Sequence, residues 1–404
     1  MKSTPSALLA VSLLLAMSTA HSAPPDLDQL LGAAVERGDA PGLVVMAGDR
    51  QGVLFQGAYG RAESGAGRGM ALDAIFRIAS MTKAVTSVAV MQLVEAGRLG
   101  LDDPAAKYVP ELANVQVFES FDAATGSYRL RAPRSPITVR QLLTHTSGLG
   151  YSFVSPILKQ FKPREGETHA YGPLLFDPGT DWHYGTSTDV LGRIVEKLAG
   201  RDLETHFKER ILGPLGLHDT SYTLPPEKFP RLVNLHRRRA AGGFDEDPRT
   251  QPTPPKSFSG GGGLYSTARD YLRFLRMLLN DGELDGVRIL APDTVAQMAR
   301  NHIGELHARA HRSTIPDRSR DFSFTDEAKD KWGLGFQIAG APPAGRRSPG
   351  SLGWAGIFNT YFWVDPTRGV AGVILMQFYP FADLRALAVY DTFERGVYER
   401  LGRP

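Results

Sequence analysis

The pair of residues best suited to chemistry is Ser80 and Lys83, three positions apart at the start of a strongly helical segment. Residues three apart lie on one face of a helix, so the serine hydroxyl and the lysine amine can meet. The N-terminal end of a helix favours an alkoxide on Ser80, and burial favours the neutral form of a lysine. The pair predicts a nucleophilic serine with a lysine base. An N-cap serine followed by a surface lysine is the simpler alternative.

A second element lies downstream, where Pro178 to Thr186 leads into a predicted helix and carries Tyr184. A tyrosine hydroxyl near a lysine ammonium can move a proton between a nucleophile and a leaving group. Without Ser80, an ordinary packed tyrosine would be the preferred interpretation.

The order of these elements resembles that of the serine β-lactamases and penicillin-binding proteins, whose second element reads Tyr-x-Asn. Residues 137–149 and 261–268 resemble the same family, so the similarity runs from about residue 27 to the C-terminus. The resemblance implies a β-lactamase/transpeptidase-like fold of the α/β (α+β) class. An antiparallel sheet flanked by terminal helices would lie beside an all-helical lobe, with the active site between them and neither cofactor nor metal required.

The third element of that family departs from the lactamase pattern. The lactamases use Lys-Thr-Gly, which is absent here, and Gly353-Trp354-Ala355-Gly356 is the best candidate for its place. An apolar Trp354 suits an uncharged acyl substrate, because a penicillin carboxylate would lose its cationic partner. Thr186 replaces the Asn of Tyr-x-Asn and cannot reproduce its amide. Both departures point away from efficient β-lactamase action, and Trp-x-Gly resembles the third element of the family VIII carboxylesterases.

The resemblance also implies roles for individual residues. Ser80, Lys83 and Tyr184 are the expected catalytic residues, and the backbone N–H groups of Ser80 and Ile357 would form the oxyanion hole. Trp354, Gly356 and Thr186 are expected around the substrate.

Apolar periodicity predicts regular structure at both ends of the chain. The expected elements are a helix over 27–37, strands over 42–47, 53–58, 332–338, 360–364 and 370–376, and a helix over 382–401. The middle is helix-rich, with helices over 80–96, 188–198 and 267–279. We therefore predict a single domain over residues 24–404. Its α/β lobe joins 24–75 to 332–404, and 76–331 form the helical lobe.

Three other constellations have simpler interpretations. The cluster of His302, Glu305, His307 and His311 has helical spacing, but it continues into a charged loop and is interpreted as a solvated face. His145 lacks the Gly-x-Ser-x-Gly elbow of an α/β-hydrolase. The glycine run over residues 260–263 lacks the Gly-Lys-Ser/Thr of a phosphate loop, so close backbone packing is expected.

Composition and the N-terminal residues indicate which partners the protein binds and whether it is exported. The 404 residues carry a net charge of only +3, which does not indicate a nucleic-acid partner, and residues 237–239, all arginine, are interpreted as a solvated loop. Residues 1–23 have the pattern of a secretory signal peptide, and no later stretch is apolar enough for a membrane span. With no cysteine to carry a lipid, we expect an exported protein, periplasmic or secreted.

The sequence thus predicts a serine hydrolase that cleaves small-molecule ester (acyl) substrates through an acyl-enzyme on Ser80. One alternative keeps this chemistry in a D,D-carboxypeptidase or β-lactamase. Another is a non-catalytic binding or sensor protein of the same fold. The oligomeric state, the acyl chain length, the competition between hydrolysis and acyl transfer, and the choice of Lys83 or Tyr184 as general base stay open.

Overall fold

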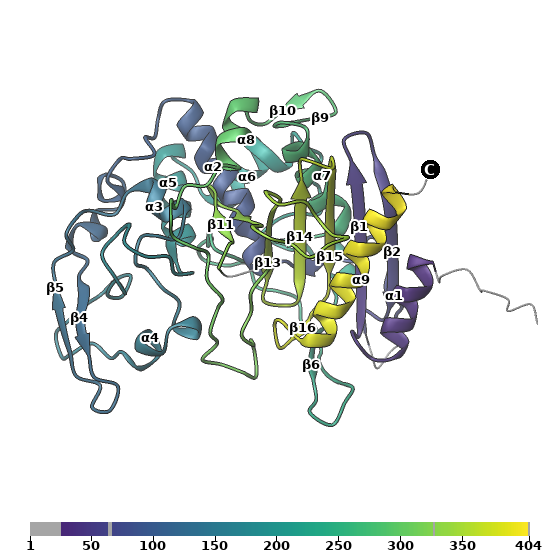
Figure 1. Ribbon diagram of the computed structural model, residues 1–404, viewed down its shortest axis with the longest axis horizontal. Helices are drawn as coiled ribbons and strands as arrows, with labels where there is room; N and C mark the ends of the chain where they lie inside the picture. The colour runs from purple at the N-terminus through teal and green to yellow at the C-terminus, as the bar shows by residue number, and fades with distance from the viewer. Residues whose placement is uncertain (1–25, 64–66, 326–327, 403–404) are drawn as a thin grey trace, which may run out of the picture.

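The two ends of the chain form one antiparallel sheet of seven strands, in the order β11-β12-β13-β14-β15-β1-β2. The computed structural model describes residues 26–63, 67–325 and 328–402, so the predicted signal peptide lies outside the described residues. Figure 1 shows the N-terminal strands beside those from the C-terminal part of the chain. The strands are β1 (Gly42–Asp49), β2 (Val53–Gly60), β11 (Lys331–Trp332), β12 (Gln337–Ile338), β13 (Leu352–Gly356), β14 (Thr360–Asp365) and β15 (Val370–Leu375).

Both faces of the sheet are covered by helices. Because successive side chains of a strand point to opposite faces, Leu43 and Val45 pack against α1 (Leu27–Glu36) and α9 (Leu384–Leu401). Val44 and Met46 face the larger core that contains α7 (Ala268–Leu279). The sheet is therefore the middle layer of the α/β part, as the resemblance implied.

The other helices gather on one side of this sheet (Figure 1). They are α2 (Thr82–Glu95), α3 (Val139–Leu143), α4 (Pro156–Gln160), α5 (Ser187–Ala199), α6 (Leu203–Phe207) and α8 (Pro292–Met298), together with short 3₁₀ and π turns. Most residues of α2 are buried, including those on every side of the helix. A helix apolar all round is a core element, and α2 lies between the sheet and the helical part.

The middle of the chain also contains short β-structure that the all-helical prediction lacked. Its strands are β3 (Phe76–Arg77), β4 (Val117–Phe121), β5 (Tyr128–Arg131), β6 (Leu235–Arg238), β7 (Phe244–Asp247), β8 (Tyr265–Ser266), β9 (Glu283–Leu284) and β10 (Val287–Arg288). β16 (Phe378–Tyr379) pairs with β6, so a C-terminal strand joins a hairpin from the middle of the chain.

Two local predictions are wrong. The arginine run was expected in a solvated loop, but Arg238 ends β6 and its Nε lies 2.7 Å from Asp383 Oδ2, with side chains only 10% and 3% exposed. Residues 332–338 do not form one strand: β11 and β12 pair with each other, and Gly335, at φ 100°, lies in the turn between them. The remaining predicted helices and strands are found within a few residues of their expected bounds.

Within the described ranges, no helix combines the length and the apolar character needed to cross a bilayer.

Candidate active site

Ser80 lies in a tight 3₁₀ turn, Ala79–Met81, that leads directly into α2. Ala79 has φ 47°, in the left-handed region that L residues rarely adopt. Such strain persists only where surrounding contacts impose it. Here Ile78 N donates to Leu264 O at 3.0 Å, and Leu264 N donates to Thr82 Oγ1 at 3.2 Å. Leu264 belongs to residues 261–268, one of the segments that resemble the family. This segment therefore fixes the turn that presents Ser80.

Lys83 is buried one turn further along α2, with 2% of its surface exposed. Its Nζ lies 2.7 Å from Gly261 O, 3.2 Å from Tyr151 Oη and 3.4 Å from Ser80 Oγ. The spacing of serine and lysine thus brings the two groups together, as the helical geometry predicted.

The protons around Lys83 can be assigned from the partners of Tyr151. Tyr151 Oη donates to Asp189 Oδ2 at 3.1 Å, because an ionised carboxylate can only accept. Burial, Tyr184 and Asp189 together raise the pKa of Tyr151 well above its usual value, so the phenol keeps its proton. Its oxygen must then accept from Lys83, and Gly261 O accepts a second N–H. Two oxygens thus hold Lys83 Nζ in place, 3.4 Å from Ser80 Oγ and within reach of the serine proton.

Asp189 holds this arrangement from α5. Its carboxylate also accepts hydrogen bonds from Ser259 Oγ and from Gly261 N, the latter at 3.3 Å. A Cβ at the neighbouring Gly260 would lie 2.3 Å from the backbone Thr188 O, which confirms the close backbone packing expected for the glycine run. Neither Tyr151 nor Asp189 was selected from the sequence. Tyr151 directly follows the family-like segment 137–149, but only the tertiary structure places it at Lys83.

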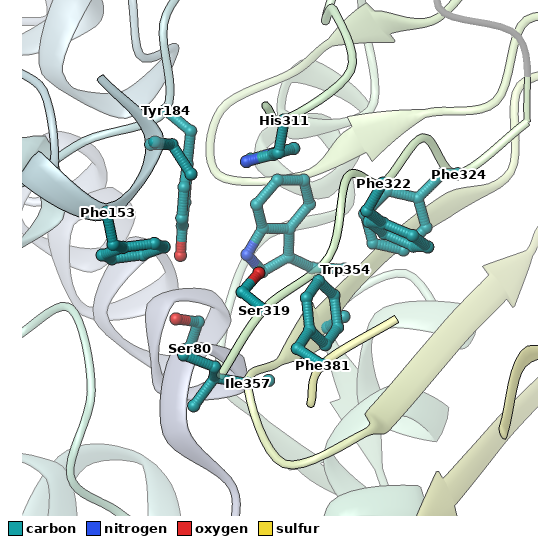
Figure 2. Close-up of a pocket in the computed structure, with 13 residues that line it drawn as sticks. Ser80, Phe153, Tyr184, His311, Ser319, Phe322, Phe324, Trp354, Ile357 and Phe381 are labelled. Atoms are coloured by element: carbon teal, nitrogen blue, oxygen red, sulfur yellow. The ribbon is translucent and has the colours of Figure 1, made fainter. Parts of the chain in front are cut away.

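Tyr184 lies against the same lysine without bonding to it. Lys83 Nζ is 4.9 Å from the centre of the Tyr184 ring, and within the described part of the chain the buried Tyr184 Oη has no hydrogen-bond partner. Figure 2 shows this hydroxyl pointing toward Ser80. Ring contacts at 5.0 Å to Trp354 and 4.8 Å to His311 hold the phenol in place. Its free oxygen is available to a substrate.

The third predicted element, Gly353 to Gly356, lies on β13 and ends beside the turn that carries Ser80. A Cβ at Gly356 would lie 2.3 Å from Ile78 O, so this glycine lets the strand approach the Ser80 turn closely. Ile357 follows immediately and lines the pocket with Ser80, as a shared oxyanion hole requires. Trp354 stacks on Phe324, with ring centres 5.1 Å apart, and packs edge-on against Trp332 at 4.6 Å.

These side chains surround one pocket, which we name the serine pocket (Figure 2). It holds about 400 Å³ of free space including its mouth. It is lined by Ser80, Phe153, Val154, Tyr184, His311, Ser319, Phe322, Phe324, Trp354, Ala355, Gly356, Ile357 and Phe381. None of these described lining residues is an Asp, Glu, Lys or Arg. The pocket therefore favours an uncharged, apolar group next to Ser80.

Thr186 does not join the described residues that line this pocket. It caps α5, and its buried Oγ1 has no partner within the described residues. The expected role of Thr186 beside the substrate stays a prediction.

The prediction that His311 lies on a solvated face is wrong. The segment after residue 308 folds back over the pocket, and His311 bonds to Phe322 through both backbone groups, at 2.8 and 3.0 Å. Burial, with His183 and Lys83 nearby, lowers the pKa of His311 to about 3, so its imidazole is neutral at pH 7. His302, from the same cluster, instead bonds Arg140 at 3.0 Å. The helical spacing has no consequence because α8 ends at Met298 and residues 302–311 form no helix.

His145 supports Tyr184 and does not act on Ser80. Its carbonyl oxygen accepts from His183 N at 3.0 Å, and its Nδ1 accepts from Gly185 N at 3.4 Å. Burial, Lys83 and the neighbouring histidines hold the pKa of His145 well below its usual value. Among the residues that the structure describes, no group of three or more His, Asp or Glu side chains is arranged to hold a metal ion.

A serine and a buried lysine on one helix, beside an antiparallel sheet whose strand closes the pocket, define the serine acyl-transfer class built on the β-lactamase fold. The chain belongs to the beta-lactamase family, whose model matches residues 27–393. The resemblance and the fold predicted from the sequence are thereby confirmed.

Several relatives match most of the chain. It is 35% identical to Protein Rv1367c of Mycobacterium tuberculosis, over 86% of this chain and 88% of that protein. It is 31% identical to the monacolin J acid methylbutanoyltransferase of Aspergillus terreus, over 90% and 93% of the two chains. It is also 31% identical to the lovastatin esterase of Penicillium rubens, over 93% and 98%. The solved structure of simvastatin synthase from Aspergillus terreus superposes with a TM-score of 0.79 at 28% identity, covering 94% of this chain and 98% of that one.

Proposed function

We propose that the protein is a serine hydrolase that cleaves carboxylic esters through an acyl-enzyme on Ser80. The observation that carries the proposal is the geometry at Lys83, whose Nζ is held by Gly261 O and Tyr151 Oη and lies 3.4 Å from Ser80 Oγ. A relative named as an esterase and another named as an acyltransferase, each similar over most of the chain, support acyl chemistry at such a site.

In the first half of the reaction, Lys83 accepts the Ser80 proton as Oγ attacks the acyl carbon. The oxyanion that forms would bind the backbone N–H groups of Ser80 and Ile357. Tyr184 Oη passes the proton from Lys83 to the alcohol oxygen, and the alcohol leaves. In the second half, water attacks the acyl-enzyme and the same groups return the proton to Ser80.

The pocket favours esters over β-lactams and cell-wall peptides. Those substrates carry a carboxylate, and Trp354 stands where the lactamases place a lysine. The described lining of the serine pocket holds no cation to replace it. Placing an unpaired carboxylate against these aromatic rings would cost several kcal/mol.

Transfer of the acyl group to an alcohol is the second candidate function. It shares the first half of the mechanism and differs only in whether water or an alcohol attacks the acyl-enzyme. The similarity to a methylbutanoyltransferase supports it, as does the apolar lining of the serine pocket, which disfavours bound water.

Steady-state hydrolysis of p-nitrophenyl butyrate by the mature protein tests the proposal. We expect turnover that Ser80→Ala abolishes, while Ser152→Ala, at an exposed serine outside the pocket, keeps it. Full activity in Ser80→Ala would overturn the assignment of the nucleophile. Faster turnover of a chromogenic cephalosporin than of the ester would favour the β-lactamase alternative. No labelling by an active-site serine probe would favour a binding protein.

We also propose that the protein is exported with removal of residues 1–23, on the pattern of its N-terminal sequence. Cell fractionation and N-terminal sequencing of the mature chain test this, and a cytoplasmic protein that keeps Met1 would contradict it.

A further inference from the structure

A pocket lies at the end of α2 that is remote from Ser80, and we name it the basic pocket. It holds about 710 Å³ of free space including its mouth. Its lining includes Gln92, Arg98, Arg201, His206, Glu209 and Arg210. Because α2 has 14 residues and a helix rises about 1.5 Å per residue, the basic pocket lies about 20 Å from Ser80. A ligand bound there is therefore not the substrate that Ser80 attacks.

The basic pocket carries an excess of positive charge. Among the described residues that line it are three arginines, Arg98, Arg201 and Arg210, and one acidic residue, Glu209. Glu209 forms an ion pair with Arg201. Arg98 donates to the backbone oxygen of Leu198, and within the described part of the chain neither Arg98 nor Arg210 has a carboxylate partner. Two positive charges are therefore left for a ligand.

A buried imidazole distinguishes the basic pocket from an ordinary set of surface arginines. His206 has 6% of its surface exposed, and its Nε2 has no hydrogen-bond partner among the described residues. Burial, Arg210, Arg201 and Arg98 lower the pKa of His206 to about 4, so the ring is neutral at pH 7. A neutral imidazole can donate from one nitrogen, and a buried polar atom without a partner is costly. An oxyanion would supply the missing acceptor and offset the surrounding cations.

The backbone of the basic pocket is fixed by its own hydrogen bonds. Arg210 lies in a π-helical turn, Lys208–Leu212, in which Gly213 N donates to Lys208 O at 2.9 Å. Such turns are rare and occur frequently at functional sites. Gln92 Nε2 donates to Arg210 O at 3.1 Å, which ties the turn to α2. The cationic groups are therefore attached to rigid elements, as a binding site requires.

We propose that the basic pocket binds a phosphate group. The three arginines would pair with its oxygens, and His206 Nε2 would donate to one of them. A doubly charged group matches the two positive charges of the lining, and the planar guanidinium fork fits phosphate oxygens. Free phosphate and the phosphate of an organic ester share this chemistry, and the experiment below separates them. The inference does not depend on the proposed function, because it concerns the opposite end of α2.

An NMR titration at constant ionic strength tests the proposal through the His206 imidazole signal, which is identified by its loss in His206→Gln. With sodium phosphate we expect a saturable shift of this signal and a Kd of about 1 mM or below. Arg210→Gln should weaken binding about 10-fold or more, because a charged hydrogen-bond partner is lost. Acetate, which carries a single charge, should bind about 10-fold more weakly than phosphate. Tighter binding of glycerol phosphate than of phosphate would identify an organic phosphate, and the reverse would identify the free ion.

Arg269→Gln is the matched control, because Arg269 is an exposed arginine that does not line the basic pocket. It removes the same charge and should bind phosphate like the wild type. Arg98→Gln, in the basic pocket, decides the question if Arg210→Gln does not fold. A shift that never saturates, acetate that binds as tightly as phosphate, or equal affinities in the Arg210→Gln and Arg269→Gln variants would overturn the inference.

Discussion

At the scale of single residues, the site holds two tyrosines that differ in their hydrogen-bond partners. Tyr151 is fixed by hydrogen bonds to Lys83 and Asp189. The Tyr184 oxygen has no partner within the described residues and points toward Ser80. Tyr151 therefore orients the lysine as a positioning residue, whereas Tyr184 is free to meet the leaving group. This division gives each hydroxyl a different expected effect on the reaction.

Removing each hydroxyl tests the division. Tyr184→Phe should lower kcat by about 100-fold to 10,000-fold, the usual contribution of proton transfer, with most loss on alkyl esters, whose leaving groups need a proton. Tyr151→Phe should act equally on alkyl and p-nitrophenyl esters and change the pH profile of kcat/KM, because it alters the surroundings of Lys83. Tyr171→Phe, outside the serine pocket, is the control. Identical leaving-group dependence in the two variants would contradict this assignment.

At the scale of elements, β13 and the Ser80 turn meet without space for a methyl group. The contact depends on Gly356, whose added Cβ would lie 2.3 Å from Ile78 O. The backbone carbonyl cannot rotate away as a flexible side chain would. A larger residue must therefore separate the strand from the turn, and with it Ile357 from Ser80.

We predict that Gly356→Ala lowers kcat/KM for p-nitrophenyl butyrate by about 100-fold, the cost of misplacing a reacting group by about 1 Å. Its far-UV circular dichroism should stay that of the wild type. Gly32→Ala is the matched control, because nothing lies within 4 Å of a Cβ at that position in α1. Wild-type kinetics in Gly356→Ala would show that this approach does not position the oxyanion donors.

A buried ion pair joins α9 to the segment before β13. Arg347 Nε and Nη2 each lie 2.7 Å from a carboxylate oxygen of Glu394, and the two side chains are 4% and 1% exposed. Leaving one buried charge without its partner costs about 3–5 kcal/mol.

Glu394→Gln should therefore lower the free energy of unfolding in urea by about 3–5 kcal/mol. The double variant Arg347→Met with Glu394→Leu should recover most of that loss, because it removes both charges. A double variant no more stable than Glu394→Gln would mean that the pair is needed for more than mutual neutralisation.

At the scale of the whole molecule, folding buries imidazoles close to Lys83. The pKa of His311 falls from 6.5 to about 3 through burial, His183 and Lys83, and burial lowers that of His183 to about 4. Between pH 6.5 and about 3 the unfolded chain binds more protons than the folded one. Stability is therefore greatest above pH 6.5 and falls as the pH decreases through this window.

Urea unfolding between pH 7 and 4.5 tests this. Below pH 6.5, each such histidine should remove up to about 1.4 kcal/mol of unfolding free energy per pH unit, and His311→Gln should lose less stability with acid than the wild type. His218→Gln, at an exposed histidine, should behave like the wild type. An unchanged slope in His311→Gln would contradict the burial of a neutral imidazole.

Much of this site could be predicted from the sequence because its geometry is local. Ser80 and Lys83 meet since residues three apart share a helix face, and the glycine run predicts close backbone approach. Short apolar runs on either side of turn residues likewise predicted β1, β2, β14 and β15. The resemblance added Tyr184, Trp354 and Gly356, which lie far from Ser80 in the chain and yet enter the same pocket.

The sequence by itself thus determined the class of fold, the paired serine and lysine, and the loss of the lactamase cation at Trp354. Only the tertiary structure decided that Tyr151 and Asp189 orient Lys83, that His311 closes the pocket, and that Arg238 is buried with Asp383. The reason is physical. Helical and strand periods relate residues a few positions apart. The partners of a buried polar group, by contrast, depend on which distant segments pack against it.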